Sequence, residues 1–422
     1  MITSASWAGR RYAVLGLARS GAATVSALVA SDALVTAWDE DEARRDAVAG
    51  TTLTDPLETD LTGFDGVVVS PGVPINRHPI AAHAARFGVP LIGDIELFAQ
   101  ARSELPAHKV VGITGTNGKS TTTALVAHIC RTAGLPTLMG GNIGLPILAQ
   151  APLPAGGVYV LELSSYQLDL THNLDCDVAV LLNITPDHLD RYDGFEAYAA
   201  SKARLFDMQS AGQRAVIAID DTPSYAIAKG RKGVDRISAG GCMDQSRWPA
   251  LQGPHNAQNA LAAIAVAQAL GIDNAAVDAA LESFGGLPHR MERVRTRDGV
   301  TFVNDSKATN PASTAPALAA FERIHWILGG QAKTAELDAC APHFGHVARA
   351  YTIGEAGPML AAVLDGQVPV EQARTLDRAV ASAAREARSG DTVMLSPACA
   401  SFDQFRDYEA RGDAFREAVG AL

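Results

Sequence analysis

The chain has 422 residues and a formal net charge of −11 at pH 7, and 47% of its residues are hydrophobic and 19% charged. This length predicts two to four domains, and the acidic balance argues against a nucleic-acid-binding protein, which usually carries a basic face. The five cysteines form no C-x-x-C pair, which argues against a disulfide framework and against a cysteine zinc site. No run of about 18 apolar residues and no apolar leader segment is present. We therefore expect a cytoplasmic protein. The sequence does not show the oligomeric state, and a monomer is the default expectation.

Short runs rich in Val, Leu and Ile alternate with helix-like segments along almost the whole chain. Because these runs are apolar throughout rather than alternating, they are typical of parallel strands buried on both faces. We predict strands at residues 11–17, 33–39, 65–72, 110–115, 158–164, 178–185, 301–306, 325–330, 349–354 and 391–397. A helix is predicted at residues 375–390, with Thr375 as its cap, Asp377 in its first turn and Gly390 as its stop. The alternation indicates an α/β protein with several βαβ sheets.

The first predicted βα turn, residues 13–21, is similar to a dinucleotide-binding fingerprint. Gly16 and Gly21 lie in the turn, and Asp39 follows about 20 residues later, as an acid that binds a ribose would. Ala18 occupies the position of the middle glycine, so the evidence for NAD is weak. We interpret the segment as a Rossmann-like turn that holds another phosphate or nucleotide.

A second glycine-rich turn, residues 112–120, follows a predicted strand and precedes a predicted helix. It departs from the strict G-x-x-x-x-G-K-[ST] pattern because Ile113 stands where the first glycine belongs. Backbone N–H groups converge at such a turn and the helix dipole adds positive potential, so the turn favours a phosphate. Lys119 is expected on the β- and γ-phosphates and Ser120 on Mg²⁺. A chance G-K-S tripeptide is the alternative.

Two further side chains are candidate metal ligands because they follow neighbouring predicted strands. Glu162 lies near the end of the apolar run at 158–164, where an unpaired carboxylate would cost several kcal/mol. His188 lies just beyond the run at 178–185, at the edge where open α/β sheets collect ligands. The alternatives are a structural ion pair for Glu162 and an ordinary surface position for His188.

Two polar clusters follow strands in the last third of the chain, at residues 305–309 and 401–402. Polar loops at strand ends are where binding sites are usually built. The alternative is helix capping, by Asp305 or Ser306 in the first cluster and by Ser401 at the start of the last helix.

Together these segments resemble, in order and spacing, the Mur ligases. The resemblance covers the chain from about residue 10 to its end and rests on GITGTNGKST, GGNIGLP, LELSSYQL, NITPDHLDRY, GPHNAQNALAA, GLPHRMERV, NDSKATNPAST and SPACASFDQF. Three of these, LELSSYQL, NDSKATN and SPACAS, are distinctive of the member that adds D-glutamate to UDP-N-acetylmuramoyl-L-alanine in peptidoglycan precursor synthesis. The D-N-P-R motif of the ligase that adds diaminopimelate or lysine is absent.

The resemblance implies three domains and an ATP-dependent reaction. The domains are expected at residues 1–97 (Rossmann-like, binding UDP), 98–286 (a central P-loop ATPase) and 287–422 (Rossmann-like, binding the amino acid). The reaction implied is transfer of the γ-phosphoryl group of ATP to the alanine carboxylate, with Mg²⁺ as cofactor. The amine of glutamate then attacks the acyl phosphate.

The resemblance also assigns roles to individual residues. ATP is expected to contact Gly115, Thr116, Asn117, Gly118, Lys119, Ser120, Thr121, Asn256, Asn259, Arg290 and Asp305. The UDP substrate is expected to contact Arg19, Ser20, Asp39, Ser70, Pro71, Gly72 and Asn142. Glutamate is expected to contact Lys307, Thr309, Lys333, Ser401 and Phe402. The metal ligands implied are Ser120, Glu162, His188 and a carbamylated Lys202, and the catalytic residues are Lys119, His188 and Lys202.

Three alternatives remain at this stage. The chain could be a ligase of the same family with another acceptor, such as an L-glutamate variant, another Mur ligase or a folylpolyglutamate synthase, which shares the GTNGK motif. It could also be a regulatory protein that binds a nucleotide without chemistry. An NAD-dependent dehydrogenase is the weakest alternative.

Overall fold

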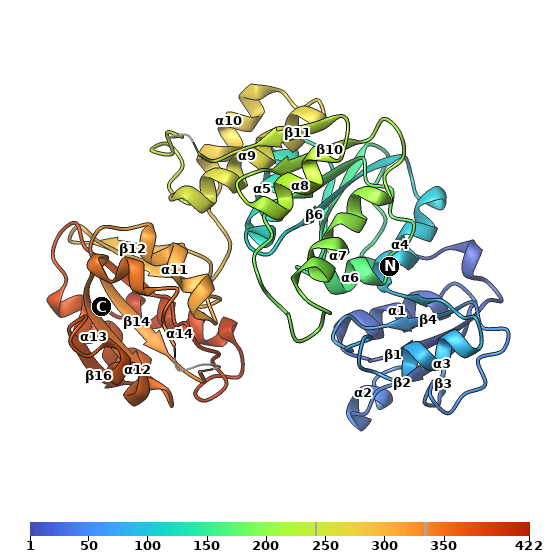
Figure 1. Cartoon of the computed structure of the whole chain (residues 1–422), viewed down its shortest axis with the longest axis horizontal. Helices are drawn as coiled ribbons and strands as arrows, with labels where there is room; N and C mark the ends of the chain where they lie inside the picture. Colours follow the sequence, from blue (N-terminus) through green and yellow to red (C-terminus); the bar gives the residue numbers. More distant parts are fainter. Residues whose placement is uncertain (241–242, 333–335) are drawn as a thin grey trace. The chain divides into compact units, whose positions relative to one another are not determined.

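The computed structural model describes the whole chain except residues 241–242 and 333–335. The strands of the described residues form three separate sheets, each flanked by helices (Figure 1). This confirms the prediction of an α/β fold with several sheets. No helix in the described part of the chain is long and apolar enough to cross a membrane.

The first sheet contains five parallel strands in the order β3-β2-β1-β4-β5. Its strands are β1 (Arg11–Leu15), β2 (Leu34–Trp38), β3 (Thr52–Leu53), β4 (Gly66–Val69) and β5 (Leu91–Ile92). The accompanying helices are α1 (Arg19–Val29), α2 (Glu42–Asp46), α3 (Ile80–Arg86) and α4 (Asp94–Ala101). The reversal of strand order beside β1 places the turns after β1 and β4 next to each other, at the edge where such sheets bind ligands.

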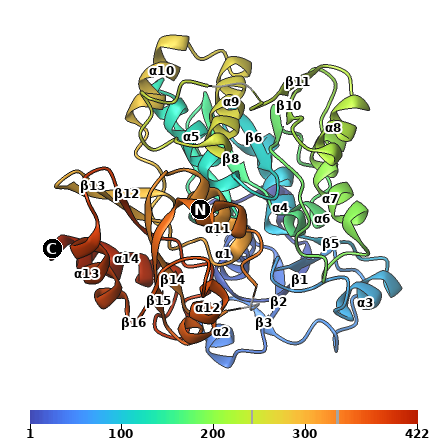
Figure 2. The same ribbon diagram turned by 60° about the vertical axis from the view of Figure 1, so that its left-hand side comes forward.

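The second sheet contains six parallel strands in the order β11-β10-β9-β6-β8-β7. They are β6 (His108–Thr114), β7 (Thr137–Gly141), β8 (Gly157–Glu162), β9 (Val178–Leu181), β10 (Arg214–Ala218) and β11 (Val234–Ile237). Its helices are α5 (Lys119–Thr132), α6 (Ser165–Asp169), α7 (Phe195–Asp207), α8 (Thr222–Lys229), α9 (Pro254–Ala269) and α10 (Asn274–Ser283). Figure 2 shows α5 alongside β6 and β8, and α6 beside α7.

The third sheet contains six strands in the order β12-β13-β17-β14-β15-β16, and only the β12–β13 pair is antiparallel. The strands are β12 (Glu292–Arg297), β13 (Val300–Asn304), β14 (Ile324–Gly329), β15 (Val347–Ile353), β16 (Val370–Arg374) and β17 (Thr392–Leu395). Its helices are α11 (Pro311–Ala319), α12 (Gly357–Leu364), α13 (Leu376–Glu386) and α14 (Tyr408–Gly420). Four short 3₁₀ helices complete the described elements: Ala5–Trp7, Arg102–Glu104, Ile147–Ala149 and Ala341–His346.

The central strands of the third sheet, β14 and β17, are buried on both faces, as their uniformly apolar sequences predict. In β14, Trp326 belongs to the apolar cluster on one face and Ile327 to the cluster on the other. Met394 and Leu395 divide between the same two clusters in β17. A strand that packs helices on both faces has no polar side to show, so its sequence contains an unbroken apolar run.

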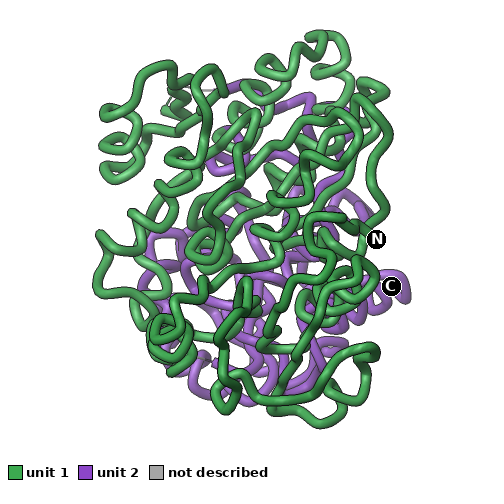
Figure 3. The backbone as a smooth tube through the Cα atoms, turned by 90° about the vertical axis from the view of Figure 1, so that its right-hand side faces the viewer, with its two compact units in different colours: residues 1–242, 258–281 green, residues 243–257, 282–422 purple. Residues whose placement is uncertain are grey.

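The described residues divide into two compact units (Figure 3). One contains residues 1–242 and 258–281, and therefore the first two sheets, and the other contains residues 243–257 and 282–422, and therefore the third sheet. This division into two units does not test the boundaries of the three predicted domains, which stay a prediction.

Each strand predicted from the sequence overlaps a strand of the structure. The predicted helix at 375–390 is shorter than expected, because α13 ends at Glu386. Beyond it the chain is held by Asp391, whose carboxylate accepts a 2.9 Å hydrogen bond from the Arg388 N–H. Thr375 occupies the N-cap position, but its side chain makes no capping hydrogen bond.

Candidate functional site

The glycine-rich turn after β6 has the geometry of a phosphate-binding loop. Gly115 and Gly118 have φ values of 151° and 85°, and α5 begins at Lys119. A Cβ atom at Gly118 would lie 2.3 Å from Asn259 Oδ1, so a larger residue does not fit without a shift. Lys119 Nζ donates hydrogen bonds to the carbonyls of Gly115 (2.9 Å) and Thr116 (2.7 Å). The loop, its lysine and the helix N-terminus therefore meet as predicted.

Asn183, which was not predicted from the sequence, anchors this loop to the end of β9 through hydrogen bonds. The Asn183 carbonyl accepts from the Thr116 N–H at 2.8 Å, and its side-chain oxygen accepts from the Asn117 N–H at 2.8 Å. Tyr198 was also not predicted from the sequence. Its hydroxyl oxygen lies 3.1 Å from Thr116 Oγ1. The signal for Asn183 was present, since a polar residue there interrupts an apolar strand run.

Glu162 ends β8 directly beside β6, where it is paired with Ile113. Its side chain is 3% exposed, and Oε1 accepts a 2.9 Å hydrogen bond from Asn142 Nδ2. Oε2 is buried without a hydrogen-bond partner among the described residues. A buried carboxylate oxygen without a partner is costly, so this position is suited to a cation rather than to the structural ion pair that was the alternative.

Lys202 reaches the phosphate loop from α7. Its side chain is 1% exposed, and Nζ donates a 2.9 Å hydrogen bond to the Gly115 carbonyl and lies 4.6 Å from the centre of the Tyr198 ring. Burial, and then the charge of Lys119, lower the pKa of Lys202 well below its ordinary value. A lowered pKa increases the fraction of a lysine that is in its neutral, nucleophilic amine form.

His188 lies in the loop after β9, as predicted, and adopts a left-handed conformation with φ of 53°. Its ring centre is 5.0 Å from that of Tyr166 and 6.4 Å from that of Tyr198. Partial burial lowers the pKa of His188, and the charges of Lys119 and Lys202 lower it further, while Asp187 opposes them. A histidine kept neutral can offer a ring nitrogen to a metal.

The turn after β1 is closed by contacts within the first sheet. Asp39 Oδ2 accepts a 2.6 Å hydrogen bond from the Leu17 N–H, and Ser70 Oγ donates one of 2.7 Å to the Gly16 carbonyl. The two hydrogen bonds link the ends of β2 and β4 to the glycine turn. Arg19 extends from the same turn and donates to the Gly144 carbonyl at 2.9 Å.

The capping alternatives for the last third of the chain are wrong. Asn310 caps α11 and Asp407 caps α14. Asp305 instead accepts hydrogen bonds from Ser396 Oγ (2.8 Å) and from the Met291 N–H (3.2 Å), and burial raises the pKa of Asp305 to about 7.

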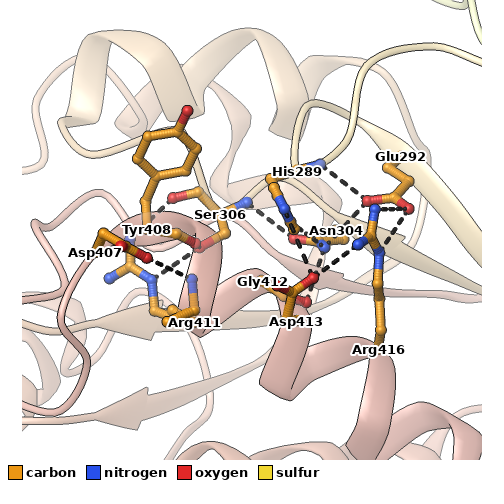
Figure 4. Close-up of polar contacts among 11 residues, drawn as sticks. His289, Glu292, Asn304, Ser306, Asp407, Tyr408, Arg411, Gly412, Asp413 and Arg416 are labelled. Carbon is orange, nitrogen blue, oxygen red and sulfur yellow. Dashed lines mark hydrogen bonds and ion pairs between the residues drawn. The ribbon is translucent and has the colours of Figure 1, made fainter. Parts of the chain in front are cut away.

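Ser306 and Arg411 form a buried polar cluster at the end of β13 (Figure 4). Ser306 Oγ donates to the Tyr408 carbonyl at 2.8 Å and accepts from Arg411 Nε at 3.0 Å. Arg411 is 1% exposed and also donates to the carbonyls of residues 306, 329, 399 and 400. Arg411 was missed because its position in the last helix resembles that of an ordinary surface arginine.

A second network in Figure 4 surrounds Asn304. Its side-chain amide contacts His289 Nδ1 at 3.0 Å and donates to Glu292 Oε2 at 3.2 Å and to the Gly412 carbonyl at 3.0 Å. His289 has a left-handed φ of 60° and immediately precedes Arg290. The network therefore fixes the backbone that presents Arg290, one of the residues expected to hold ATP.

The remaining residues expected to bind glutamate or adenine vary in their placement. Lys307 Nζ lies 5.0 Å from the Tyr408 ring centre, Ser401 is buried and Phe402 is 68% exposed. Thr309 is half-buried, and Asn256 donates to the Gln252 carbonyl at 3.0 Å. Asn259 accepts from Thr122 of α5 at 3.1 Å. Lys333 lies outside the described residues.

The fold and this loop define a nucleotide-binding α/β protein whose phosphate loop lies beside a buried acid and a buried lysine. Sequence comparisons identify the family. Residues 113–246 match the Mur ligase middle domain, and residues 289–399 match the domain described as Mur ligase, glutamate ligase domain. The chain belongs to the Mur ligase family, whose members are ATP-dependent, amide-bond-forming ligases.

Three relatives are named UDP-N-acetylmuramoylalanine--D-glutamate ligase. The chain is 64% identical to that of Sphingopyxis alaskensis over 100% of both chains. It is 63% identical to that of Novosphingobium aromaticivorans, over 100% of this chain and 97% of the relative, and 59% identical to that of Zymomonas mobilis, over 100% of both.

Solved structures share the fold at much lower identity. UDP-N-acetylmuramate-alanine ligase of Thermotoga maritima has a TM-score of 0.59 at 17% identity and covers 98% of this chain and 99% of its own. A second structure, MurF of Acinetobacter baumannii, has a TM-score of 0.60 at 18% identity and covers 98% and 92%.

Proposed function

We propose that this ligase joins D-glutamate to UDP-N-acetylmuramoyl-L-alanine with consumption of ATP, as a step of peptidoglycan precursor synthesis in the cytoplasm. The proposal is supported by relatives of that name at 59–64% identity over the full chain. The structural observation that carries it is the convergence of the phosphate loop, Glu162 and Lys202 at the carboxyl edge of one sheet.

The chemistry explains why a phosphate loop serves an amide ligase. A carboxylate is a poor acyl donor because its leaving group would be oxide. A carboxylate oxygen of the alanyl group therefore attacks the γ-phosphorus of ATP, which forms an acyl phosphate and releases ADP. The amine of glutamate then attacks the activated carbonyl, loses a proton, and expels inorganic phosphate from the tetrahedral intermediate. Lys119 and the backbone N–H groups of the loop hold the phosphates and stabilise the charge that moves between them.

Mg²⁺ fits the donors that the site contains. The unpaired buried oxygen of Glu162 and the hydroxyl of Ser120 are hard oxygen ligands of the kind that Mg²⁺ prefers. We place His188 and a carbamylated Lys202 with them. When bound, Mg²⁺ supplies neutralisation of phosphate charge.

The environment of Lys202 favours carbamylation. Its lowered pKa favours the neutral amine, whose Nζ carries a lone pair. That lone pair attacks the carbon of CO₂, an N–C bond forms, and one proton is released to solvent. The product is an anion, so its formation places a negative charge beside Lys119.

We also propose where each substrate binds. UDP would lie at the turns after β1 and β4, the adenine at Asn259 and Asn256, and glutamate at the polar clusters after β13 and β17. The three-domain division at 1–97, 98–286 and 287–422 is proposed on the same basis, one sheet for each ligand.

An acceptor screen tests the function. Phosphate release is measured with ATP, Mg²⁺ and UDP-N-acetylmuramoyl-L-alanine, and with D-glutamate, L-glutamate, diaminopimelate, lysine or D-alanyl-D-alanine as acceptor. We expect release with D-glutamate at a rate at least about tenfold above the others. Release only with another acceptor, or only with a folate and glutamate, would replace the proposed substrate. ATP binding without release under any of these conditions would indicate a protein without ligase activity.

A further inference from the structure

Arg191 connects the loop to which the proposed function assigns the UDP substrate with the loop that carries the proposed metal ligand His188. Its guanidinium donates to the Val73 carbonyl at 2.9 Å and to the Pro71 and Gly72 carbonyls at 3.4 Å. These three residues follow β4, in the loop expected to bind the UDP substrate. Arg191 itself belongs to the loop after β9 that carries His188.

A second hydrogen bond joins Arg191 to this substrate loop. Asn76 Nδ2, a few residues beyond Val73, donates to the Arg191 carbonyl. On the other side of the same loop, Ser70 Oγ donates to the Gly16 carbonyl. The segment at residues 70–76 is therefore tied at one end to the glycine turn of the first sheet and at the other to Arg191 of the second.

Arg191 is also coupled to His188. Its backbone N–H donates a 2.8 Å hydrogen bond to the His188 carbonyl and closes a turn around that residue. Its guanidinium carbon lies 3.7 Å from the centre of the Tyr166 ring, and the same ring lies 5.0 Å from that of His188. Tyr166 belongs to α6, which begins three residues after Glu162. One side chain thus contacts the substrate loop while its neighbours set the position of His188.

We propose that Arg191 is a positioning residue that orders the UDP-substrate loop at residues 70–73 and the His188 loop together. The inference rests on the proposed function and adds a residue to it. A loop that must be ordered by its ligand binds more weakly than one that is already ordered. His188 has a left-handed backbone, which persists only where surrounding contacts hold it.

The contacts require an arginine rather than any cation. Several N–H groups of one planar guanidinium can reach the carbonyls of three successive residues while its face stacks on an aromatic ring. A lysine ammonium is a point charge on a flexible stem and cannot do both. The substitution Arg191→Lys therefore keeps the charge and removes the geometry.

Steady-state kinetics of Arg191→Lys and Arg191→Ala test the proposal. We expect KM for UDP-N-acetylmuramoyl-L-alanine to rise at least about tenfold in both variants, which is ~1.4 kcal/mol of binding. We expect kcat to fall because His188 is displaced, and KM for ATP to change less than about threefold. The matched control is Arg86→Ala, which removes an exposed arginine whose guanidinium lies 6.0 Å from the Phe87 ring. This control should leave all three KM values and kcat unchanged.

A purely structural role predicts a different pattern. It would lower the melting temperature and the fraction of active enzyme without selectively raising KM for one substrate, and full activity of Arg191→Lys would show that charge alone suffices. Either result would overturn the proposal. If Arg191→Ala does not fold, Arg191→Lys and Asn76→Ala provide the test, and Asn76→Ala is expected to raise the same KM by a smaller factor.

Chemical rescue provides a second measurement. A cavity of about 300 Å³ is lined by Arg191, Tyr166, Tyr192 and Asn76, so a small cation can reach the position of the guanidinium. Millimolar guanidinium chloride should lower the raised KM of Arg191→Ala at least about threefold and leave Arg86→Ala unchanged. A higher melting temperature without any change in KM would contradict the proposal.

Calorimetric titration of UDP-N-acetylmuramoyl-L-alanine without ATP distinguishes the two failures. If the unsubstituted chain does not bind this substrate, the proposed function fails. If it binds and Arg191→Lys binds equally well, the inference alone fails.

Discussion

Replacing Asp305 by asparagine should stabilise the protein at neutral pH while it impairs the reaction. Asp305 lies just after β13, is 6% exposed and has a pKa raised to about 7 by burial. Its two hydrogen bonds are compatible with an amide, whose oxygen can accept from the Met291 N–H and whose NH₂ can donate to Ser396 Oγ. The substitution therefore removes the ionisation and retains the shape.

The raised pKa of Asp305 determines both the sign and the size of the change in the free energy of unfolding. A carboxyl group with a folded-state pKa above its unfolded value binds its proton more tightly when folded, so its ionisation destabilises the folded state. The free energy of unfolding falls as pH rises from about 4 to 7 and is constant above that range. Three pKa units correspond to ~4 kcal/mol as an upper limit. Asp305→Asn should therefore be more stable than the unsubstituted protein at pH 8 by up to ~4 kcal/mol, and by less than half of this at pH 5.

Urea unfolding at pH 5, 6 and 8 measures this difference. Tryptophan fluorescence is a suitable signal because Trp326 is buried in the same sheet. The matched control is Asp377→Asn, which changes an exposed aspartate of α13 and should alter stability by no more than about 0.5 kcal/mol. A variant at Asp305 that is equally or less stable at pH 8, or a difference that does not depend on pH, would refute the reasoning. Phosphate release by Asp305→Asn should fall at the same time, because the carboxylate is proposed to hold ATP.

Three further predictions concern the phosphate loop and its neighbours. Lys202→Ala should lower turnover at least about a hundredfold and abolish any response to added bicarbonate, while ATP binding is retained; intact ligation by this variant would exclude the carbamate. Glu162→Gln should raise the Mg²⁺ concentration for half-maximal activity about tenfold to a hundredfold, and an unchanged Mg²⁺ titration would contradict the metal assignment. Gly118→Ala should weaken ATP binding and destabilise the chain by at least about 1–2 kcal/mol, because of its positive φ and the contact with Asn259. Its control is Gly134→Ala, which has a similar φ of 77° but no atom within 4 Å of the added Cβ, so equal loss of ATP binding in both variants would refute the steric argument.

Most strands that were missed are short or partly exposed, although β10 (Arg214–Ala218), buried at four of its five positions, was missed as well and the partly buried β2 was predicted. β8 and β14 are buried at every position and appear as unbroken apolar runs. β12, with the sequence ERVRTR, is largely exposed because it is the antiparallel edge strand of its sheet. β3 has two exposed residues and depends on its neighbour β2 for its conformation. Strands of this kind are set by sheet pairing rather than by local composition.

The residues of the site also divide into those that the local sequence predicts and those that depend on contacts with distant segments. Lys119 and Glu162 could be predicted because each lies where a strand ends, and strand ends converge in a parallel sheet. The burial of Lys202 could not, since it depends on α7 packing its side chain against the Gly115 carbonyl, 87 residues away in the chain. Arg191 was missed for the same reason: its partners at residues 71–73 lie in the loop after β4, a strand of a different sheet, more than 100 residues away in the chain.

Three buried acids, Asp94, Glu162 and Asp305, lower the stability of the folded chain near its proposed binding sites. Asp94 Oδ2 and Glu162 Oε2 have no hydrogen-bond partner among the described residues, and burial raises the pKa of Asp94 to about 6 and that of Asp305 to about 7. Each of the three lies beside residues proposed to bind a ligand: Asp94 shares a small cavity with Ser70, Glu162 adjoins the phosphate loop, and Asp305, itself expected to contact ATP, adjoins the glutamate cluster. A buried, incompletely paired carboxyl group destabilises the folded state, and natural proteins retain such groups where function requires them. Ligands that bring cations or donors to these positions bind only the folded chain, so they increase its stability by mass action. The electrostatic cost of burying these acids in the free protein is therefore offset when the substrates and the cation bind beside them.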